Sequence, residues 1–346
     1  MRRTAPAHAK PAVWFPTIRA GTGSDVFTQR LCEALTARGI RADITWLPHR
    51  AEYLPWSIAK PEKPAWATIV HINTWLHHSL VPYGARLVAT MHHNVHDDNL
   101  DPFKRWPQRL YHRWWIKPME SWTLRHADRI TAVSHYTGRE IERTFRIADT
   151  HVIHNGIDLD IFRPPLERKR SPSFRLLYVG SWSARKGTDL LAPIMRCLGD
   201  DFELEYTWAS HRPTPRDLPA NCRSIGKPDL AGLVTAYQRC DALLFPSRLE
   251  GFGQVVAEAM GCGLPVIARN SSALPEIIDA EHTGILVDGD NAGRYADAAI
   301  DLRNDQEKWN MMSIAARKRA EAHFGIERMI DRYILLYHSM MKGYNP

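Results

Sequence analysis

The chain has 346 residues, of which 44% are hydrophobic and 24% charged, and its formal net charge at pH 7 is +7. This length predicts two domains, and the composition, without repeats or low-complexity tracts, is that of a soluble globular protein. No apolar run reaches the length that spans a bilayer, and the basic start lacks the apolar segment of a signal peptide.

Positive charge and tryptophan are concentrated in the first half. Residues 1–165 hold 22 Lys and Arg against 15 Asp and Glu, whereas the remainder holds 23 of each, and nine of the twelve tryptophans lie in the first half. This suits an anionic partner such as phosphate, nucleic acid or a lipid surface, although solubility alone also accounts for such an excess. The five scattered cysteines form no CxxC pair, which predicts free thiols in a reducing compartment.

Six strands are predicted before the middle of the chain. Short, apolar, β-branched stretches cover residues 12–15, 42–47, 67–72, 86–91, 129–134 and 151–154. A helical pattern at 24–39 lies between the first two, and we expect Ser24 to cap it and Gly39 to end it. Residues 155–173 are dense in proline and charge, which is typical of an interdomain linker.

The same alternation begins again after this linker. Strands are predicted at 174–180, 202–208, 222–226, 241–247, 264–268 and 284–288. Helices are predicted from about Thr188, over 229–239, over 253–261, near Pro275 and at the end of the chain. Alternating strands and helices predict an α/β fold with two doubly wound, Rossmann-like domains. Ligands then bind at the carboxyl ends of the strands, in the cleft between facing domains.

Two loops at strand ends carry the main candidate residues. SWSARKG (181–187) presents Arg185 and Lys186 just before a helix N-terminus, which favours a phosphate, although a solvated loop is the alternative. The spacing is not that of a Walker loop. RLEGFG (248–253) places Glu250 in a glycine-broken turn.

Glu258 follows on the next predicted helix. A carboxylate accepts hydrogen bonds only, so Glu250 and Glu258 suit the vicinal diols of a sugar or a ribose. We expect both to be accessible from the cleft. In the alternative interpretation, Glu258 is a surface residue and the glycines merely end a strand.

Five segments in chain order resemble the retaining family 4 glycosyltransferases, which have the GT-B fold and use nucleotide-diphosphate sugars. They are RITAVSHYTGREI (129–141), VIHNGIDLDIF (152–162), YVGSWSARKGTDLL (178–191), PSRLEGFGQVVAEAMGCGLPVIA (246–268) and FGIERMIDRYILLYHSMM (324–341). The resemblance implies an acceptor-binding domain at 1–163, a nucleotide-sugar-binding domain at 164–325, and a helix at 326–346 that returns to the first domain.

The resemblance also implies roles for individual residues. Glu258 would hold the ribose hydroxyls, Lys186 would neutralise the diphosphate, and Glu250 would lie by the transferred sugar. A Thr-x-His at Thr90 and His92 would bring that histidine against the sugar. The implied catalytic residues are Glu250, Lys186 and His92, and the implied donor-binding residues are Gly23, Arg185, Lys186, Glu250, Gly251, Phe252, Gly253, Gln254 and Glu258.

Three positions depart from the family pattern. Ser181 stands where the family usually has a diphosphate-binding arginine, which makes Arg185 the candidate replacement. Ser272 and Ala273 replace a frequent Gly-Gly pair before Glu276, and Thr22 with Gly23 replaces a Gly-Gly pair in the first domain. These changes indicate an altered acceptor or sugar pocket.

MHHNVHDD (91–98) raises the question of a metal. His92 and His96 are four residues apart, the spacing by which one helix face binds zinc. The stretch follows a predicted strand, however, which favours a loop. The family resemblance implies a site that works without a metal, so we expect no metal and no cofactor.

The tryptophan-rich stretch 103–125 has two interpretations. Tyr111, Trp115 and Trp122 recur at helical spacing, with basic residues beside them, which fits a helix packed on the core with its arginines pointing outward. It equally fits an interfacial anchor on an anionic membrane that brings the enzyme to a lipid-linked acceptor. Pro118 is expected to interrupt the helix.

The sequence therefore predicts a cytoplasmic, retaining, metal-independent hexosyltransferase of polysaccharide or lipopolysaccharide biosynthesis, peripheral on the inner face of the membrane if residues 103–125 anchor it. The donor would be UDP- or GDP-linked, the acceptor a glycan or lipid-linked glycan, and nucleic acid no partner. Alternatives are a catalytically silent nucleotide-sugar-binding subunit and another GT-B enzyme such as a nucleotide-sugar epimerase.

Overall fold

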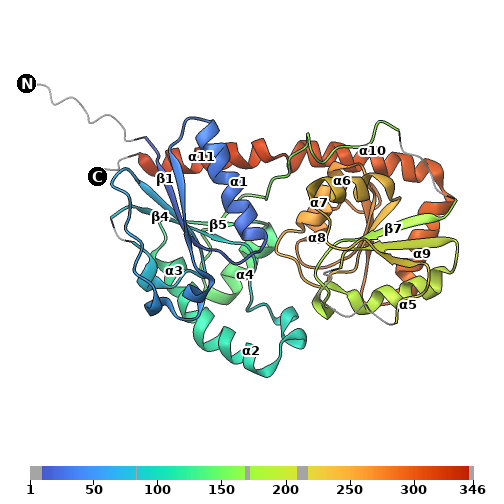
Figure 1. The fold of residues 1–346 in the computed structure, drawn as a ribbon, viewed down its shortest axis with the longest axis horizontal. Helices are drawn as coiled ribbons and strands as arrows, with labels where there is room; N and C mark the ends of the chain where they lie inside the picture. Colours follow the sequence, from blue (N-terminus) through green and yellow to red (C-terminus); the bar gives the residue numbers. More distant parts are fainter. Residues whose placement is uncertain (1–9, 83, 168–171, 209–216, 343–346) are drawn as a thin grey trace, which may run out of the picture. The chain divides into compact units, whose positions relative to one another are not determined.

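The computed structural model describes residues 10–82, 84–167, 172–208 and 217–342 and divides the chain into two compact units (Figure 1). The first unit combines the residues up to Asn155 with those from Glu327 onward. The second unit comprises Gly156–Ile326. Each unit is an α/β structure built on one parallel sheet of six strands.

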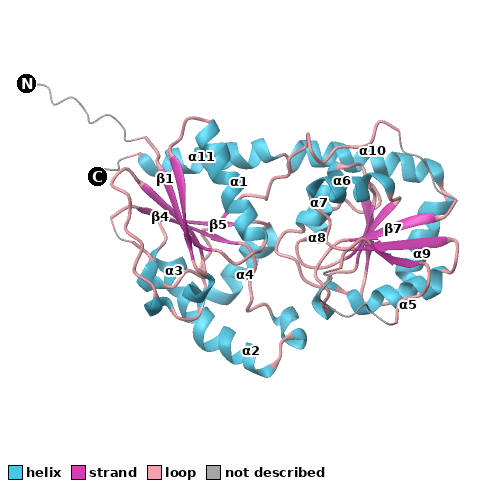
Figure 2. Ribbon diagram, in the orientation of Figure 1, coloured by secondary structure: helices cyan, strands magenta, loops and turns pink. Residues whose placement is uncertain are grey.

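The strands of the first unit fall on the six predicted stretches. They are β1 (Val13–Ile18), β2 (Ala42–Leu47), β3 (Ile69–Asn73), β4 (Arg86–Met91), β5 (Arg129–Ala132) and β6 (His151–Val152). The helices are α1 (Gly23–Ala37), α2 (Trp106–Tyr111), α3 (Lys117–His126), α4 (His135–Phe145) and α11 (Ile326–Met341). Every residue of β1 and β3 is buried, as expected for strands covered by helices on both faces (Figure 2).

The strand order of the first sheet is β2-β1-β3-β4-β5-β6. Because β1 lies between β2 and β3, the winding direction reverses there, which makes the carboxyl ends of β1 and β3 a topological switch point. The chain leaves β1 into the loop before α1 and leaves β3 at Asn73. Loops at such a point are where open α/β sheets bind ligands.

The second unit repeats this architecture. Its strands, again on the six predicted stretches, are β7 (Phe174–Tyr178), β8 (Phe202–Tyr206), β9 (Cys222–Ser224), β10 (Ala242–Phe245), β11 (Val266–Arg269) and β12 (Gly284–Val287). Its helices are α5 (Thr188–Leu198), α6 (Leu230–Arg239), α7 (Gln254–Gly261), α8 (Leu274–Ile277), α9 (Ala292–Asn304) and α10 (Gln306–His323). The strand order is β12-β11-β10-β7-β8-β9, which places the switch point between β7 and β10.

The two predicted ends of helix α1 have different outcomes. Gly39 ends the helix as predicted: its φ is +76°, and the amides of Gly39 and Ile40 donate to Thr36 and Leu35 in the pattern of a Schellman motif. The prediction of Ser24 as the cap is wrong. The helix begins at Gly23, after Thr22, and the Ser24 hydroxyl lies within hydrogen-bond distance of the Thr22 hydroxyl instead of bonding a backbone amide.

Residues 156–163, which the sequence predicted to belong to a linker and to the end of the first domain, lie in the second unit. Ile157 forms a parallel bridge with Gly325, far along the chain. Phe162 is fully buried against Tyr237, and Arg317 donates to its carbonyl at 2.7 Å. These tertiary contacts fix a segment whose proline and charge content is typical of a free linker.

Helix α11 packs on the sheet of the first unit. The hydroxyl of Tyr337 bonds Nδ1 of the buried His71 at 2.7 Å, and Nε2 of the same ring lies 2.6 Å from Thr90 Oγ1. Tyr333 packs edge-on against Phe27 of α1. The first unit therefore includes α11, which follows the second unit in the chain.

All five cysteines are free thiols, as predicted. Among the described residues, no helix combines the length and the apolar character needed to cross a bilayer.

Candidate active site

The two predicted loops of the second unit meet at the switch point between β7 and β10. Gly187 ends the first loop with φ at +71°, and a Cβ atom at this position would lie 2.1 Å from the carbonyl oxygen of Pro246 in the second loop. Only glycine permits this approach of one backbone to the other. The turn Ala184–Lys186 therefore lies directly beside the Glu250 turn.

Lys186 and Glu250 form an ion pair in which Nζ lies 2.6 Å from Oε1. The hydroxyl of the fully buried Ser247 donates to the same oxygen at 2.6 Å. Burial by itself raises the pKa of the Glu250 carboxyl, but Lys186, the Ser247 hydroxyl and Arg185 outweigh it and hold the pKa below its ordinary value. Glu250 is thus a carboxylate at neutral pH, next to the partly exposed ammonium group of Lys186.

Arg185 lies in the same pair of loops. Its Nη1 donates to the carbonyl of Leu249 at 3.0 Å, and its own carbonyl accepts from the Arg248 amide at 2.9 Å. The side chain of Arg248 is bound to Asp189 and Asp290. Arg185 and Lys186 therefore bring two cationic side chains to this end of the sheet.

Ser272 stabilises the turn that contains Glu250. Its hydroxyl accepts from the Glu250 amide at 2.9 Å. Its φ of +53° lies in the left-handed region that favours glycine, which is where the family has a Gly-Gly pair. This chain thus keeps the glycine-like backbone and adds a hydroxyl that bonds the turn.

Glycine is also required where helix α7 begins. Gly253 has φ at +103°, and a Cβ atom there would lie 3.1 Å from Leu274 and 3.2 Å from Ile277. The first turn of an α-helix has backbone N–H groups without partners inside the helix, which favours a negatively charged or hydroxylated ligand. The turn Gly251–Gln254 leads directly into this helix start.

Glu258 is not a surface residue, since it is 8% exposed, and the alternative interpretation of it is wrong. Its Oε2 accepts from the buried Tyr237 hydroxyl at 3.1 Å and its Oε1 from Gln254 Nε2 at 3.4 Å. Burial, followed by the neighbouring carboxylate, raises the pKa of Tyr237, so the phenol stays a donor. The expected accessibility of both glutamates is corrected to near-complete burial, since Glu250 is also 8% exposed.

A pocket of about 380 Å³ lies at the carboxyl ends of β7, β8 and β9. Its walls include Gly180, Trp182, Trp208 and Lys227. The two indole rings meet edge to face with their centroids 5.0 Å apart. An apolar pocket of this size accommodates a planar ring system, such as a base.

In the first unit, Gly23 and His92 lie at the same edge of the sheet. Gly23 starts α1 after the loop that follows β1, and His92 follows β4. Phe27, one helical turn after Gly23, packs edge-on against the His92 ring with the centroids 4.6 Å apart. The predicted loop after β4 is confirmed.

His92 is held by a relay of two further polar residues. Its Nε2 lies 3.1 Å from Asn73 Oδ1, and the Asn73 amide nitrogen donates to Thr17 Oγ1 at 3.1 Å. Since a carbonyl oxygen only accepts, Nε2 carries the ring proton and Nδ1 keeps its lone pair. Burial lowers the pKa of His92 to about 4, so the ring is neutral.

His96 faces a different partner from His92. Its Nε2 lies 2.9 Å from Oε2 of Glu120, a buried carboxylate that also accepts from Thr74 at 3.0 Å. Within the described ranges, no group of three His, Cys, Asp or Glu side chains has the arrangement that holds a metal ion. His92 therefore bonds Asn73 while His96 bonds Glu120, and the two histidines do not share a partner.

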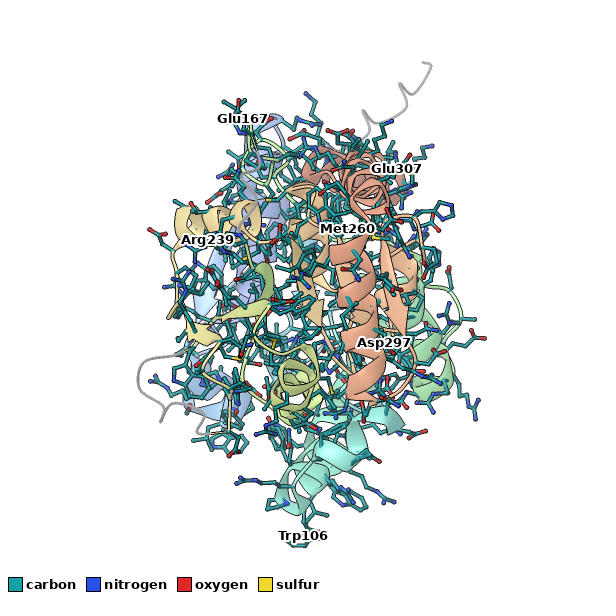
Figure 3. The ribbon with its side chains drawn as sticks, turned by 90° about the vertical axis from the view of Figure 1, so that its right-hand side faces the viewer. Trp106, Glu167, Arg239, Met260, Asp297 and Glu307 are labelled. Atoms are coloured by element: carbon teal, nitrogen blue, oxygen red, sulfur yellow. The ribbon has the colours of Figure 1, made fainter. Side chains whose placement is uncertain are left out.

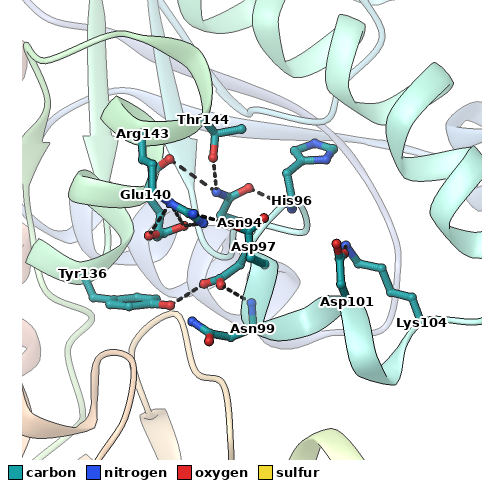
Figure 4. A network of polar contacts seen from close by, with 11 residues as sticks. Asn94, His96, Asp97, Asn99, Asp101, Lys104, Tyr136, Glu140, Arg143 and Thr144 are labelled. Atoms are coloured by element: carbon teal, nitrogen blue, oxygen red, sulfur yellow. Dashed lines mark hydrogen bonds and ion pairs between the residues drawn. The ribbon is translucent and has the colours of Figure 1, made fainter.

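The loop that carries both histidines is fixed to helix α4 by the network in Figure 4. Asn94 Nδ2 donates to Thr144 Oγ1 at 2.8 Å, and its Oδ1 accepts from the His96 amide at 2.9 Å. The Tyr136 hydroxyl bonds Asp97 Oδ2. Residues 92–97 therefore have a defined backbone although they form neither helix nor strand.

Residues 106–126 remain helical through Pro118, contrary to the expected interruption. Pro118 is the second residue of α3, and it has no N–H to donate to the preceding helical turn. The π-helical turn His112–Ile116 joins α2 to α3, and its wider turn accommodates the proline.

Comparison with known proteins agrees with this fold. Residues 45–161 match a family model described as "Glycosyltransferase Family 4", and residues 206–319 match one described as "Glycosyl transferases group 1". The chain belongs to the GT-B glycosyltransferases. A curated D-inositol 3-phosphate glycosyltransferase from Paenarthrobacter aurescens is 31% identical to this GT-B chain over 233 residues, which cover 61% of the chain and 55% of the relative. The chain thus spans about half the length of that relative.

Solved GT-B structures share the fold at low identity. Sucrose-phosphate synthase from Thermosynechococcus elongatus is 21% identical, with a TM-score of 0.81 over 96% of this chain and 100% of that one. The Anabaena protein HepE in complex with UDP-glucose is 15% identical, with a TM-score of 0.70 over 95% of this chain and 99% of that one.

In each unit of this GT-B chain, polar residues that the sequence analysis did not select lie beside the candidate residues. Ser247 follows β10, Asn73 ends β3 and Thr17 is the next-to-last residue of β1. Each lies near the carboxyl end of a buried strand, which is where ligands bind in such sheets. Tyr237 lies within helix α6, and nothing in the sequence marks it as the partner of Glu258.

Proposed function

We propose that the protein is a retaining glycosyltransferase of hexosyltransferase type, which moves a sugar from a UDP- or GDP-linked donor to a glycan or lipid-linked glycan. The observation that carries this proposal is the pairing of Lys186 with Glu250 at the switch point, beside Arg185. A diphosphate needs cations, and a sugar needs acceptors for its hydroxyls. The two loops supply both within a single site.

The reaction breaks the bond between the anomeric carbon and the diphosphate oxygen. The acceptor hydroxyl attacks from the same face, and its proton passes to the departing diphosphate, so the configuration is retained. Lys186 and Arg185 stabilise the negative charge that develops on the leaving group, and the amides that start α7 assist. Glu250 stabilises the positive character of the sugar ring through its carboxylate.

The donor's nucleoside is proposed to lie along the second sheet edge. Glu258 would accept from the ribose hydroxyls, with Tyr237 and Gln254 fixing its orientation. The pocket beside Trp182 and Trp208 would hold the base. The UDP-glucose complex of the structurally similar HepE supports a UDP-linked donor.

The proposed donor-contacting residues in the first unit are His92 and Gly23. The bare Nδ1 of His92 suits a sugar hydroxyl, because a hydroxyl can donate to it. Gly23 leaves room beside the start of α1, since no atom lies within 4 Å of where its Cβ would be.

The proposed setting is the cytoplasm, at the inner face of the membrane when the acceptor is lipid-linked, in polysaccharide or lipopolysaccharide synthesis. Catalysis is proposed to need neither a metal nor a cofactor, and nucleic acid is not a proposed partner.

A thermal-shift panel of nucleotide-diphosphate sugars tests the donor. A true donor at 100 times its dissociation constant should add about 2.7 kcal/mol of stability. The anomeric configuration of the product, read by proton NMR, then tests retention. An inverted product would refute the retaining mechanism.

The alternatives give different results in the same assays. A silent partner subunit would bind a donor but turn over no acceptor. An epimerase would convert the donor with no acceptor present.

A further inference from the structure

The helical segment 106–116 has an inner side that is bound to the first unit. The Tyr111 hydroxyl donates to Glu52 Oε1 at 3.2 Å, and Trp115 Nε1 donates to the Glu52 carbonyl at 3.0 Å. The Trp115 ring also stacks on His77, with centroids 5.5 Å apart. These side chains attach the helix to the body, which fits the core-packing interpretation of the stretch.

The outer side of the same segment is apolar and exposed. Trp106 and Trp114 are 72% and 69% exposed, and Leu110 between them is 39% exposed. A spacing of four residues places such side chains on one side of a helix. Figure 3 shows Trp106 at the outer end of α2, pointing away from the ribbon. No residue of α2 is buried.

A second segment extends this surface. Tyr53, Leu54 and Trp56 are 47%, 46% and 71% exposed. The Trp56 ring lies edge-on to Trp115 at 6.1 Å, and Tyr53 lies 5.6 Å from Tyr111. The second segment therefore lies beside the helical one, and we call their six exposed side chains the aromatic face: Tyr53, Leu54, Trp56, Trp106, Leu110 and Trp114.

Positive charge surrounds the aromatic face. Between Asp101 and Glu120 the sequence has five Lys and Arg and no acidic residue. Four of the five are exposed: Arg105, Arg109, Arg113 and Lys117. The Arg113 guanidinium lies over the Trp114 ring at 5.4 Å. On the inner side, the Glu52 carboxylate accepts from the Tyr111 hydroxyl.

We propose that the aromatic face docks on an anionic lipid surface. Tryptophan and tyrosine favour the boundary between headgroups and acyl chains, and arginine and lysine are attracted to anionic headgroups. Neither feature alone gives stable attachment, whereas the two together do. A second copy of this chain is a poor occupant, because a two-fold contact would bring the four exposed cations of each copy together. The inference extends the proposed function and does not depend on donor binding or turnover.

Flotation of the full-length protein with phosphatidylcholine vesicles, with and without phosphatidylglycerol, tests this. We expect binding only to the anionic vesicles, and release as salt screens the charges. The double variant Trp106→Ala/Trp114→Ala should lower partitioning at least tenfold. Arg109→Gln/Arg113→Gln should lower it roughly thirtyfold, about fivefold for each cation.

The matched control is Met311→Ala/Ile314→Ala, which removes two exposed apolar side chains, 60% and 58% exposed, from α10. It should bind as the wild type does, and circular dichroism should show that all three double variants are folded. Equal binding to neutral and anionic vesicles, or full binding by the tryptophan variant, would overturn the proposal. So would a dimer in sedimentation velocity that the tryptophan variant abolishes, since this would assign the face to a second copy.

Discussion

Replacing Lys186 by methionine should destabilise the second unit through Glu250. Lys186 and Glu250 are 17% and 10% exposed in their side chains, so the ion pair is largely withdrawn from water. Removing one partner of a buried pair leaves an uncompensated charge, at a cost of about 3–5 kcal/mol. The lower value corresponds to a fall of roughly 6–12 °C in Tm for a unit of this size. Ser247 still donates to the carboxylate, which favours the lower value.

The pH dependence of the effect has a defined sign. In the wild type the pKa of Glu250 is lowered, so its contribution to stability is present above the unfolded value of about 4.3 and is lost as the pH falls through the folded pKa. Without Lys186, burial raises the pKa of Glu250 against only Ser247 and Arg185, so the carboxyl protonates at a higher pH and protonation relieves the variant. The stability difference between Lys186→Met and wild type should therefore shrink from pH 8 to pH 5.

Thermal unfolding followed by circular dichroism measures both effects. The double variant Lys186→Met/Glu250→Gln serves as the control, because it removes both charges and should recover most of the lost stability without recovering turnover. If Lys186→Met unfolds at the wild-type temperature, or if the double variant is no more stable than the single one, the pair does not hold the loops together and this reasoning fails.

Further tests address other residues of the site. Glu258→Ala should raise KM for the donor roughly 10- to 100-fold with less change in kcat, because ribose contacts are equal in the ground and transition states; an unchanged KM would contradict this. Asn73→Asp should raise the pKa of His92 above its present value of about 4 and move the acid limb of the kcat/KM profile to higher pH, and histidine ring nitrogen shifts would report the change directly. EDTA should leave donor binding and turnover intact, and loss of both, restored by a divalent ion, would revive the His92–His96 metal interpretation. Trp115→Ala should lower Tm while Trp114→Ala does not, since only Trp115 bonds Glu52; equal Tm values would contradict the inner and outer sides described above.

The positions of the strands and of the charged loop residues could be predicted from the sequence. Buried parallel strands are short apolar runs, and their carboxyl ends place Lys186 and Glu250 at one edge of the second sheet. Both features can be predicted because each depends only on residues that are neighbours in the sequence.

Contacts between distant parts of the chain could not be predicted in this way. The left-handed backbone of Ser272, where the family has glycine, depends on a bond to a turn 22 residues earlier. The assignment of Ile157 to the second unit depends on Gly325. The division of 103–125 into a packed side and an exposed side depends on Glu52, which no helical periodicity reveals.

Because α11 completes the first unit, this unit begins to be synthesised first but can finish folding only after the second unit has been made. His71 and Phe27 emerge early, but their partners Tyr337 and Tyr333 are made only after the second unit. At about 5–20 residues per second, the second unit takes roughly 9–34 seconds to be translated in between. During that interval the α11-binding surface of the first unit is open to solvent and to chaperones. A nascent chain truncated before Glu327 should therefore leave the first unit incomplete while the second unit is already able to fold.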